Sequence, residues 1–90
     1  MASWNCRVCG LEYTFDDPND LPWGADGRTP DYTFCSCCGV EFGYGDFTVV
    51  GARRWRSRWL EGGARWEDPK MTPSDSNLEG QLDAVPSEFR

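Results

Sequence analysis

Two short cysteine couplets, each followed by a glycine, constrain this chain more than any other feature. The first is Cys6-Arg7-Val8-Cys9-Gly10 and the second is Cys35-Ser36-Cys37-Cys38-Gly39, with 25 residues between them. A C-x-x-C couplet turns tightly enough for its two thiolates to converge, and the glycine tolerates the positive φ that such a turn demands. The couplets therefore predict one tetrahedral metal site with four sulfur ligands, namely Cys6, Cys9, Cys35 and Cys38.

The size of the chain agrees with a bound metal. Ninety residues bury little apolar surface, and small domains of this kind usually need disulfide bonds or a bound metal for stability. Disulfides are the rival use of the cysteines, but five is an odd number and Met1-Ala2-Ser3-Trp4 does not open a secretory signal. No apolar run is long enough to span a membrane. We expect a single domain over residues 1–90, located in the cytoplasm.

The identity of the metal is less constrained than its ligands. Four thiolates in a tetrahedron accept either zinc or iron, and we expect one zinc ion in a closed structural site, with iron as the alternative. Cys37 is a fifth sulfur, interpreted as a small apolar residue beside the site or as a reactive thiol. Cys37 could also replace Cys38 as the second metal ligand of this couplet. Gly39 directly follows Cys38 and therefore favours Cys35 and Cys38 as the ligand pair.

Composition narrows the possible functions. The chain has no histidine, which removes His-containing metal sites, Ser-His-Asp triads and Cys-His nucleophile pairs. The net charge is −6, and residues 1–50 hold eight acidic against two basic side chains, whereas residues 51–90 hold seven of each. An acidic surface repels phosphate backbones, so nucleic acid is a disfavoured partner and a basic protein a favoured one. We expect a protein that is not an enzyme and does not bind membranes.

The metal-binding module is predicted over residues 4–45. Aromatic residues indicate short strands at 12–15, 31–34 and 40–44. Between the first two lies a turn-rich loop, residues 16–30, whose acidic residues do not follow the spaced pattern of a calcium loop. With nearby aromatic side chains, this loop forms the predicted surface for a basic partner, made of Asp16, Asp17, Asp20, Trp23, Asp26 and Tyr44.

One amphipathic helix is predicted over residues 48–61, with Thr48 as its N-cap and Gly62 as its stop. Ala52, Trp55 and Trp59 share the face expected to pack on the metal module. The arginines of this helix are read as a solvated face or, alternatively, as a nucleic-acid contact: Arg53, Arg54, Arg56 and Arg58. The extension, residues 64–90, is expected to hold a short helix near 76–84 and to fray beyond residue 86.

The sequence resembles two known groups. Cys6-x-x-Cys9-Gly10-x-x-Tyr13 and Asp31-Tyr32-x-x-Cys35-x-x-Cys38-Gly39 are similar to the two knuckles of rubredoxin, although Ser36, Cys37 and the long extension depart from that pattern. The chain also resembles small bacterial cysteine-rich proteins of the Cys-Pro-Cys-Cys type over most of residues 4–84. This likeness includes Pro22-Trp23-Gly24-x-Asp26-Gly27, Cys35-x-Cys37-Cys38-Gly39-Val40-Glu41-Phe42-Gly43-Tyr44, Arg54-Trp55-x-x-x-Trp59-Leu60 and Trp66-x-Asp68-Pro69. It implies an accessory protein, such as an immunity or inhibitor protein.

Together these observations predict a small metal-stapled α+β fold. A zinc-ribbon or rubredoxin-like β module with two knuckles comes first, followed by the amphipathic helix and a short C-terminal helix or tail. The predicted function is a zinc-stabilised protein-binding module. A rubredoxin-like iron electron carrier and a nucleic-acid-binding zinc-ribbon adaptor are the alternatives.

Overall fold

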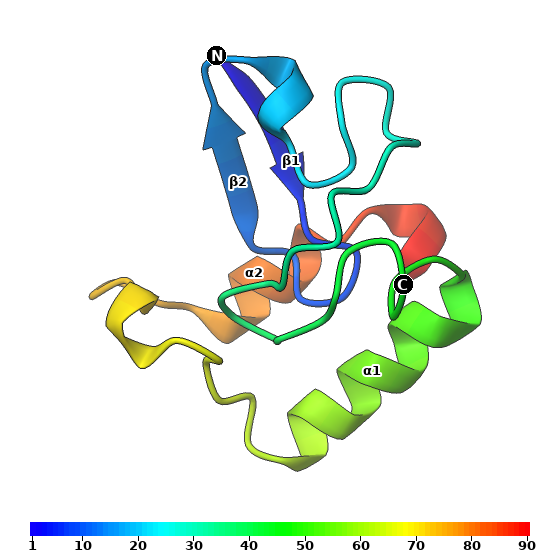
Figure 1. Ribbon diagram of the computed structural model, residues 1–90. Helices are drawn as coiled ribbons and strands as arrows, with labels where there is room; N and C mark the ends of the chain where they lie inside the picture. Colours follow the sequence, from blue (N-terminus) through cyan, green and yellow to red (C-terminus); the bar gives the residue numbers. More distant parts are fainter.

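The computed structural model describes residues 1–90, and the chain begins with a β-hairpin (Figure 1). Strand β1 (Ala2–Asn5) pairs antiparallel with strand β2 (Glu12–Phe15), and Trp4 lies opposite Tyr13. The strand predicted at 12–15 is confirmed, whereas β1 has a weak sequence signal because only Trp4 in it favours extended backbone. The first cysteine couplet connects the two strands, so the hairpin positions it.

Phe42 joins the second couplet to this hairpin. Its ring meets Trp4 edge-on at 5.3 Å and Tyr13 edge-on at 5.7 Å between centroids. Edge-to-face pairs of this kind each contribute about 0.5–1.5 kcal/mol beyond the area they bury. Phe42 is almost fully buried and lies in the same apolar cluster as the cysteines. The core of the protein therefore surrounds the cysteine couplets.

The strands predicted at 31–34 and 40–44 are wrong. One isolated bridge, between Phe34 and Glu41, flanks the second couplet in place of a strand pair. Tyr32 and Gly43 both have positive φ, 60° and 97°, and positive φ interrupts an extended run. The second couplet is therefore held by turns and by packing on the hairpin rather than by a sheet of its own.

The loop over residues 16–30 is compact. It begins with a 3₁₀ turn (Pro18–Asp20), which the side chain of Asp17 caps by accepting a hydrogen bond from the Asn19 amide at 2.9 Å. Leu21 and Trp23 then enter the core. The loop is thus anchored by apolar side chains while its acidic side chains stay in solvent.

Helix α1 (Val49–Glu61) lies across the module from the hairpin (Figure 1). As predicted, Thr48 caps it, since its hydroxyl accepts a hydrogen bond from the Gly51 amide at 3.0 Å, and Gly62 ends it. Ala52 is buried, and Trp55 and Trp59 pack against the cysteine cluster. The predicted core face of this helix is confirmed.

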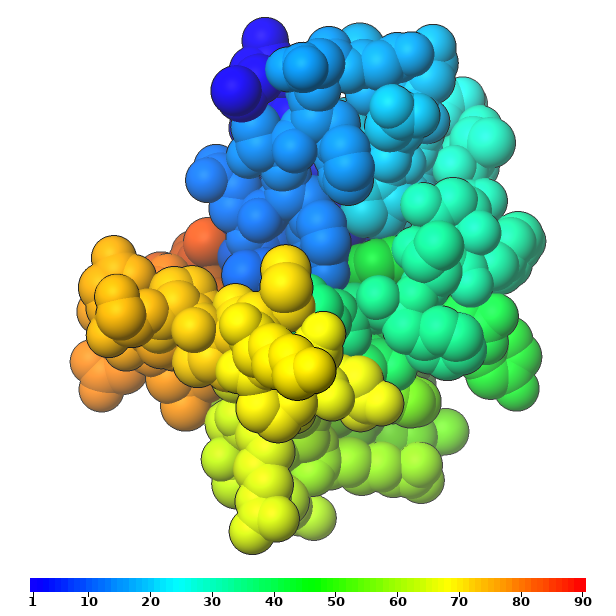
Figure 2. All heavy atoms as spheres, turned by 60° about the vertical axis from the view of Figure 1, so that its left-hand side comes forward, coloured from blue at the N-terminus to red at the C-terminus, as the bar shows by residue number.

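The extension returns to the two couplets instead of trailing away. Residues around 65–72 cross the molecule between the hairpin and α1, as the yellow segment of Figure 2 shows. The Glu67 and Asp68 amides donate to the Cys37 and Ser36 carbonyls at 2.8 and 2.9 Å.

Helix α2 (Leu78–Asp83), capped by Asn77, confirms the short C-terminal helix, and two further 3₁₀ turns span Pro69–Met71 and Ser87–Phe89. The expected fraying beyond residue 86 is wrong, because the Phe89 ring packs against the core cluster. None of the helices combines the length and the apolar character that crossing a membrane would require.

Candidate metal centre

The two couplets fold into the same tight turn, here called a knuckle: knuckle 1 is Cys6–Gly10 and knuckle 2 is Cys35–Gly39. In each knuckle the glycine amide donates to the carbonyl of the first cysteine, at 3.0 and 2.9 Å. The amide of that cysteine donates to the carbonyl after the glycine, at 2.9 Å in both. Gly10 and Gly39 have φ of 83° and 75°, as the C-x-x-C-G pattern predicts. Equal backbone turns explain why two distant segments present their sulfurs alike.

The structure brings together the four cysteines that the spacing predicts: Cys6, Cys9, Cys35 and Cys38. All four are buried, and their Sγ atoms lie within 4.8 Å of one another. The Cys6–Cys38 and Cys9–Cys35 sulfur pairs are 3.8 and 3.7 Å apart. These separations exceed a disulfide bond of about 2.05 Å and match the edge of about 3.8 Å in a tetrahedron with metal–sulfur bonds of about 2.3 Å. The donor set thus fits a tetrahedral, thiolate-bound metal ion.

Two hydrogen bonds orient the sulfurs. The Val8 amide donates to Cys6 Sγ at 3.4 Å, within knuckle 1. The Tyr13 hydroxyl donates to Cys35 Sγ at 3.3 Å and accepts from the Ser36 amide at 3.2 Å, which ties β2 to knuckle 2. Donors around a metal ligand fix its direction and tune its basicity.

The ionisation of these groups follows from their surroundings. Hydrogen bonds with the neighbouring thiols, Cys38 first, and with Tyr13 lower the pKa of Cys35 below its ordinary value. Burial, then the adjacent Cys35 charge, raise the pKa of Tyr13, so its hydroxyl remains a neutral donor to the sulfur. Hydrogen bonds among the same thiols, with Cys35 first, raise the pKa of Cys9 and Cys38, so the four thiols titrate as one cluster.

Cys37 stands outside this set of four. It is fully buried, and the Gln81 side-chain amide donates to its Sγ at 3.2 Å from helix α2. A hydrogen bond with Cys9, followed by the weaker one from Gln81, lowers the pKa of Cys37, while burial opposes the shift. Its place beside the centre fits the interpretation as a small packed side chain.

Two arginines, Arg56 and Arg7, lie close to the centre, and the contacts that they make there were not predicted from the sequence. A divalent metal with four thiolates carries a net charge of −2, so nearby cations stabilise it. Arg56 donates to three backbone carbonyls, those of Val8, Arg7 and Phe89, at 2.7, 3.0 and 2.7 Å. Burial, then the Arg53 charge, lower the pKa of Arg56, while cysteine thiolates oppose this shift. The Arg56 guanidinium thus has three partners within the fold, and a contact of this residue with nucleic acid stays a prediction.

Arg7 is the second of these cations. Its guanidinium lies 3.7 Å from the centroid of Trp23 and 4.4 Å from that of Phe89. Burial lowers the pKa of Arg7, and the charge of Asp46 opposes this effect. Cation–π contacts of this kind contribute about 0.5–2 kcal/mol. The only sequence signal was its position inside knuckle 1, where any side chain must lie close to the sulfurs.

The buried carboxylate of Asp46 is a further residue that the sequence does not reveal. It is fully buried, and it accepts hydrogen bonds from Trp23 Nε1 at 2.8 Å and from the Gly43 amide at 2.7 Å. Trp23 is only 4 % exposed, so its predicted place on an exposed partner surface is wrong. The indole N–H has its partner in the core, which explains why this large side chain is internal.

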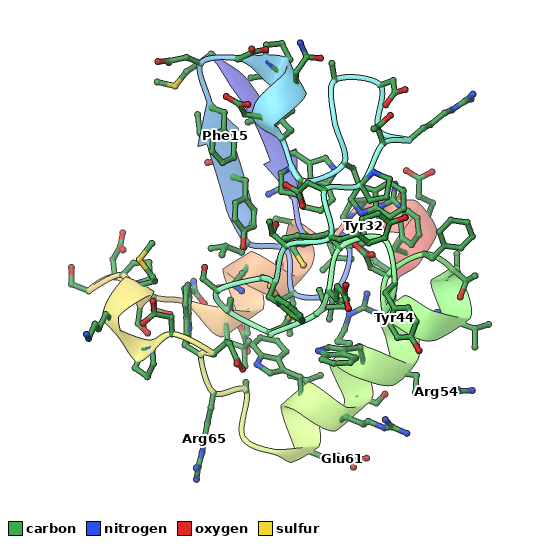
Figure 3. All side chains as sticks on the ribbon, in the orientation of Figure 1. Phe15, Tyr32, Tyr44, Arg54, Glu61 and Arg65 are labelled. Carbon is green, nitrogen blue, oxygen red and sulfur yellow. The ribbon has the colours of Figure 1, made fainter.

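The remaining residues of the predicted partner surface are in solvent. The acidic ones, namely Asp16, Asp17, Asp20 and Asp26, are exposed. Tyr44 is 78 % exposed and borders a hollow on helix α1 with Arg54 (Figure 3). Of the predicted partner surface, only Trp23 is therefore withdrawn into the core.

Comparisons with known proteins do not add a relative. No protein family, curated protein or solved structure matches this chain.

Proposed function

We propose that this chain is a zinc-stabilised protein-binding module without catalytic activity. The observation that supports it best is the cluster of four buried thiols with tetrahedral spacing. When bound, the ion would supply structure rather than chemistry, because four protein ligands leave no position for a substrate or water. A cytoplasm that keeps thiols reduced suits such a centre.

Elemental analysis tests the metal. Protein purified from cells supplied with both metals should be colourless and contain one zinc ion per chain. The alternative, a rubredoxin-like electron carrier, requires iron in the same four sulfurs and a coloured protein. A metal-free chain that remains fully folded would contradict both functions.

The segment of residues 16–31, here called the acidic loop, is the surface proposed for a basic partner. Asp26 and Asp31 line a hollow of about 400 Å³ next to Leu21. The backbone amide of Arg28, more than any other group, lowers the pKa of Asp26, so this carboxylate stays charged below its ordinary titration range. Tyr32 and Phe34 are 57 % and 64 % exposed just beyond the loop. Carboxylates would steer a basic protein toward the loop, and these rings would supply apolar contact.

Charge reversal tests this surface. The triple variant Asp16→Lys, Asp17→Lys, Asp20→Lys should lose a basic partner captured by the wild-type chain, because attraction becomes repulsion. The matched control is Asp75→Lys, Glu79→Lys, Asp83→Lys, which changes charge equally on the extension, where all three residues are exposed. Equal retention of the partner by both triple variants would exclude the acidic loop as the contact.

A further inference from the structure

The four arginines of helix α1 divide into two pairs with different surroundings. Arg53 donates to the Arg90 carbonyl, and Arg56 donates to the three carbonyls near knuckle 1. Arg54 and Arg58, one helical turn apart, are exposed, and their guanidinium groups donate no hydrogen bond to the rest of the chain. These two guanidinium groups are therefore available to a ligand.

The same side of α1 is hollowed. One hollow of about 280 Å³ is bordered by Tyr44, Arg54, Trp55 and Arg58. A second, of about 250 Å³, is bordered by Cys38, Trp55, Arg58 and Trp59. Both hollows are bordered by Trp55 and Arg58, so they adjoin on this side of α1, and together they are here called the tryptophan–arginine groove. Figure 3 shows Tyr44 and Arg54 together on this side, with Arg65 at the opposite end of the helix.

The two indoles offer only apolar surface to the groove. Trp55 Nε1 donates to the Cys38 carbonyl at 2.8 Å, and Trp59 Nε1 donates to the Arg65 carbonyl at 2.9 Å. With both N–H groups engaged, polar recognition in the groove rests on the guanidinium groups and the Tyr44 hydroxyl. The groove thus combines an apolar floor with positive charge, on a chain whose net charge is −6.

We propose that the tryptophan–arginine groove binds an acidic peptide segment of a partner protein. Guanidinium groups pair with carboxylates through two parallel hydrogen bonds. Side chains at i and i+4 of a helix lie about 5–6 Å apart at Cβ, and alternate side chains of an extended peptide lie about 7 Å apart. Two carboxylates at alternate positions therefore reach Arg54 and Arg58, and an apolar side chain two positions further reaches Trp59.

Charge favours a peptide over nucleic acid. Two unengaged arginines can neutralise two carboxylates, whereas a polynucleotide places a phosphate at every step and would meet the acidic remainder of the chain. This groove is separate from the acidic loop, and it selects a partner of the opposite charge.

The test uses a fluorescent peptide, acetyl-Glu-Ser-Glu-Ser-Leu-amide, and the metal-loaded full chain. We expect saturable binding at low salt that shifts the indole N–H resonances of Trp55 and Trp59 in nitrogen–proton spectra. The matched peptide acetyl-Gln-Ser-Gln-Ser-Leu-amide should bind at least about tenfold more weakly. No binding of the acidic peptide up to about 1 mM overturns the proposal.

Charge-reversal variants distinguish binding at the groove from general electrostatic attraction. The double variant Arg54→Glu, Arg58→Glu should bind the acidic peptide at least about tenfold more weakly than the wild-type chain does. Its metal content and its helical circular dichroism should be unchanged. Arg28→Glu makes the same type of charge change at an exposed side chain that does not border the groove, and it should bind like the wild-type chain. Equal loss in Arg28→Glu overturns the proposal, as does binding of oligothymidylate in place of the peptide.

Discussion

At the scale of single residues, the most demanding feature is the buried carboxylate of Asp46, which contacts Trp23 of the loop over residues 16–30. Both oxygens of Asp46 accept hydrogen bonds, one from the Trp23 indole and one from the Gly43 amide. A buried ionised group is tolerated only where donors and a nearby cation compensate the loss of water. Arg7 supplies this cation and also stacks on Trp23. One acidic residue therefore joins the loop, knuckle 1 and the turn before α1.

Replacing this carboxylate should reveal its role. Asp46→Asn keeps the shape but turns an NH₂ toward one of two N–H donors, which leaves a buried donor unpaired. We expect the free energy of unfolding to fall by about 1–3 kcal/mol. Urea unfolding at a fixed zinc concentration measures this free energy. The control is the exposed Asp75→Asn, which should change stability by less than about 0.5 kcal/mol. Equal stabilities of the two variants would show that the charge of Asp46 is dispensable.

At the scale of elements, each knuckle serves as a docking platform for later segments of the chain. Helix α2 packs on knuckle 1 so closely that a Cβ built on Gly10 would lie 1.8 Å from the Gln81 carbonyl oxygen. A Cβ on Gly39 would lie 2.9 Å from the Glu67 carboxylate of the extension. The knuckle glycines thus satisfy two constraints at once, positive φ and close approach of another segment.

Two alanine substitutions separate these constraints. Gly10 and Gly27 have similar φ, 83° and 71°, but a Cβ on Gly27 would meet no atom within 4 Å. Both substitutions incur the strain of an alanine at positive φ, and only Gly10→Ala also forces α2 away from knuckle 1. We expect Gly10→Ala to be the less stable by about 1–3 kcal/mol in urea unfolding, the range for overpacking. A similar loss in both would mean that α2 docking adds little stability.

Elements with a local signal could be predicted from the sequence. The knuckles follow from C-x-x-C-G, and helix α1 follows from the Thr48 cap, the Gly62 stop and the tryptophan spacing. The strands predicted at 31–34 and 40–44 do not form, because positive φ at Tyr32 and Gly43 interrupts the extended backbone and only Phe42 of their aromatic residues packs on the hairpin. No local pattern reports that Arg56 reaches the carbonyls of knuckle 1 or that Trp23 finds a buried acceptor. Such roles depend on tertiary contacts that the sequence does not encode locally.

At the scale of the whole molecule, the core and the metal centre are one structure. The four cysteines lie within the largest apolar cluster, and both Trp55 and Trp59 rest against it. Binding of a structural zinc ion contributes about 10–16 kcal/mol in small peptides, whereas an ordinary domain has about 5–15 kcal/mol of total stability. The ion would therefore account for most of the stability of this fold.

Removing the metal should unfold the protein, and two cysteine variants of knuckle 2 localise the effect. Cys35→Ser removes a ligand and should lose zinc, whereas Cys37→Ser leaves all four ligands and a side chain that can accept from Gln81. With a chelator, the wild-type chain should lose its near-ultraviolet tryptophan circular dichroism. Acid should act likewise, because protons compete with the metal for the four thiolates and zinc is released as pH falls. Retention of zinc by Cys35→Ser, or of tryptophan signals after chelation, would contradict a core organised by the ion.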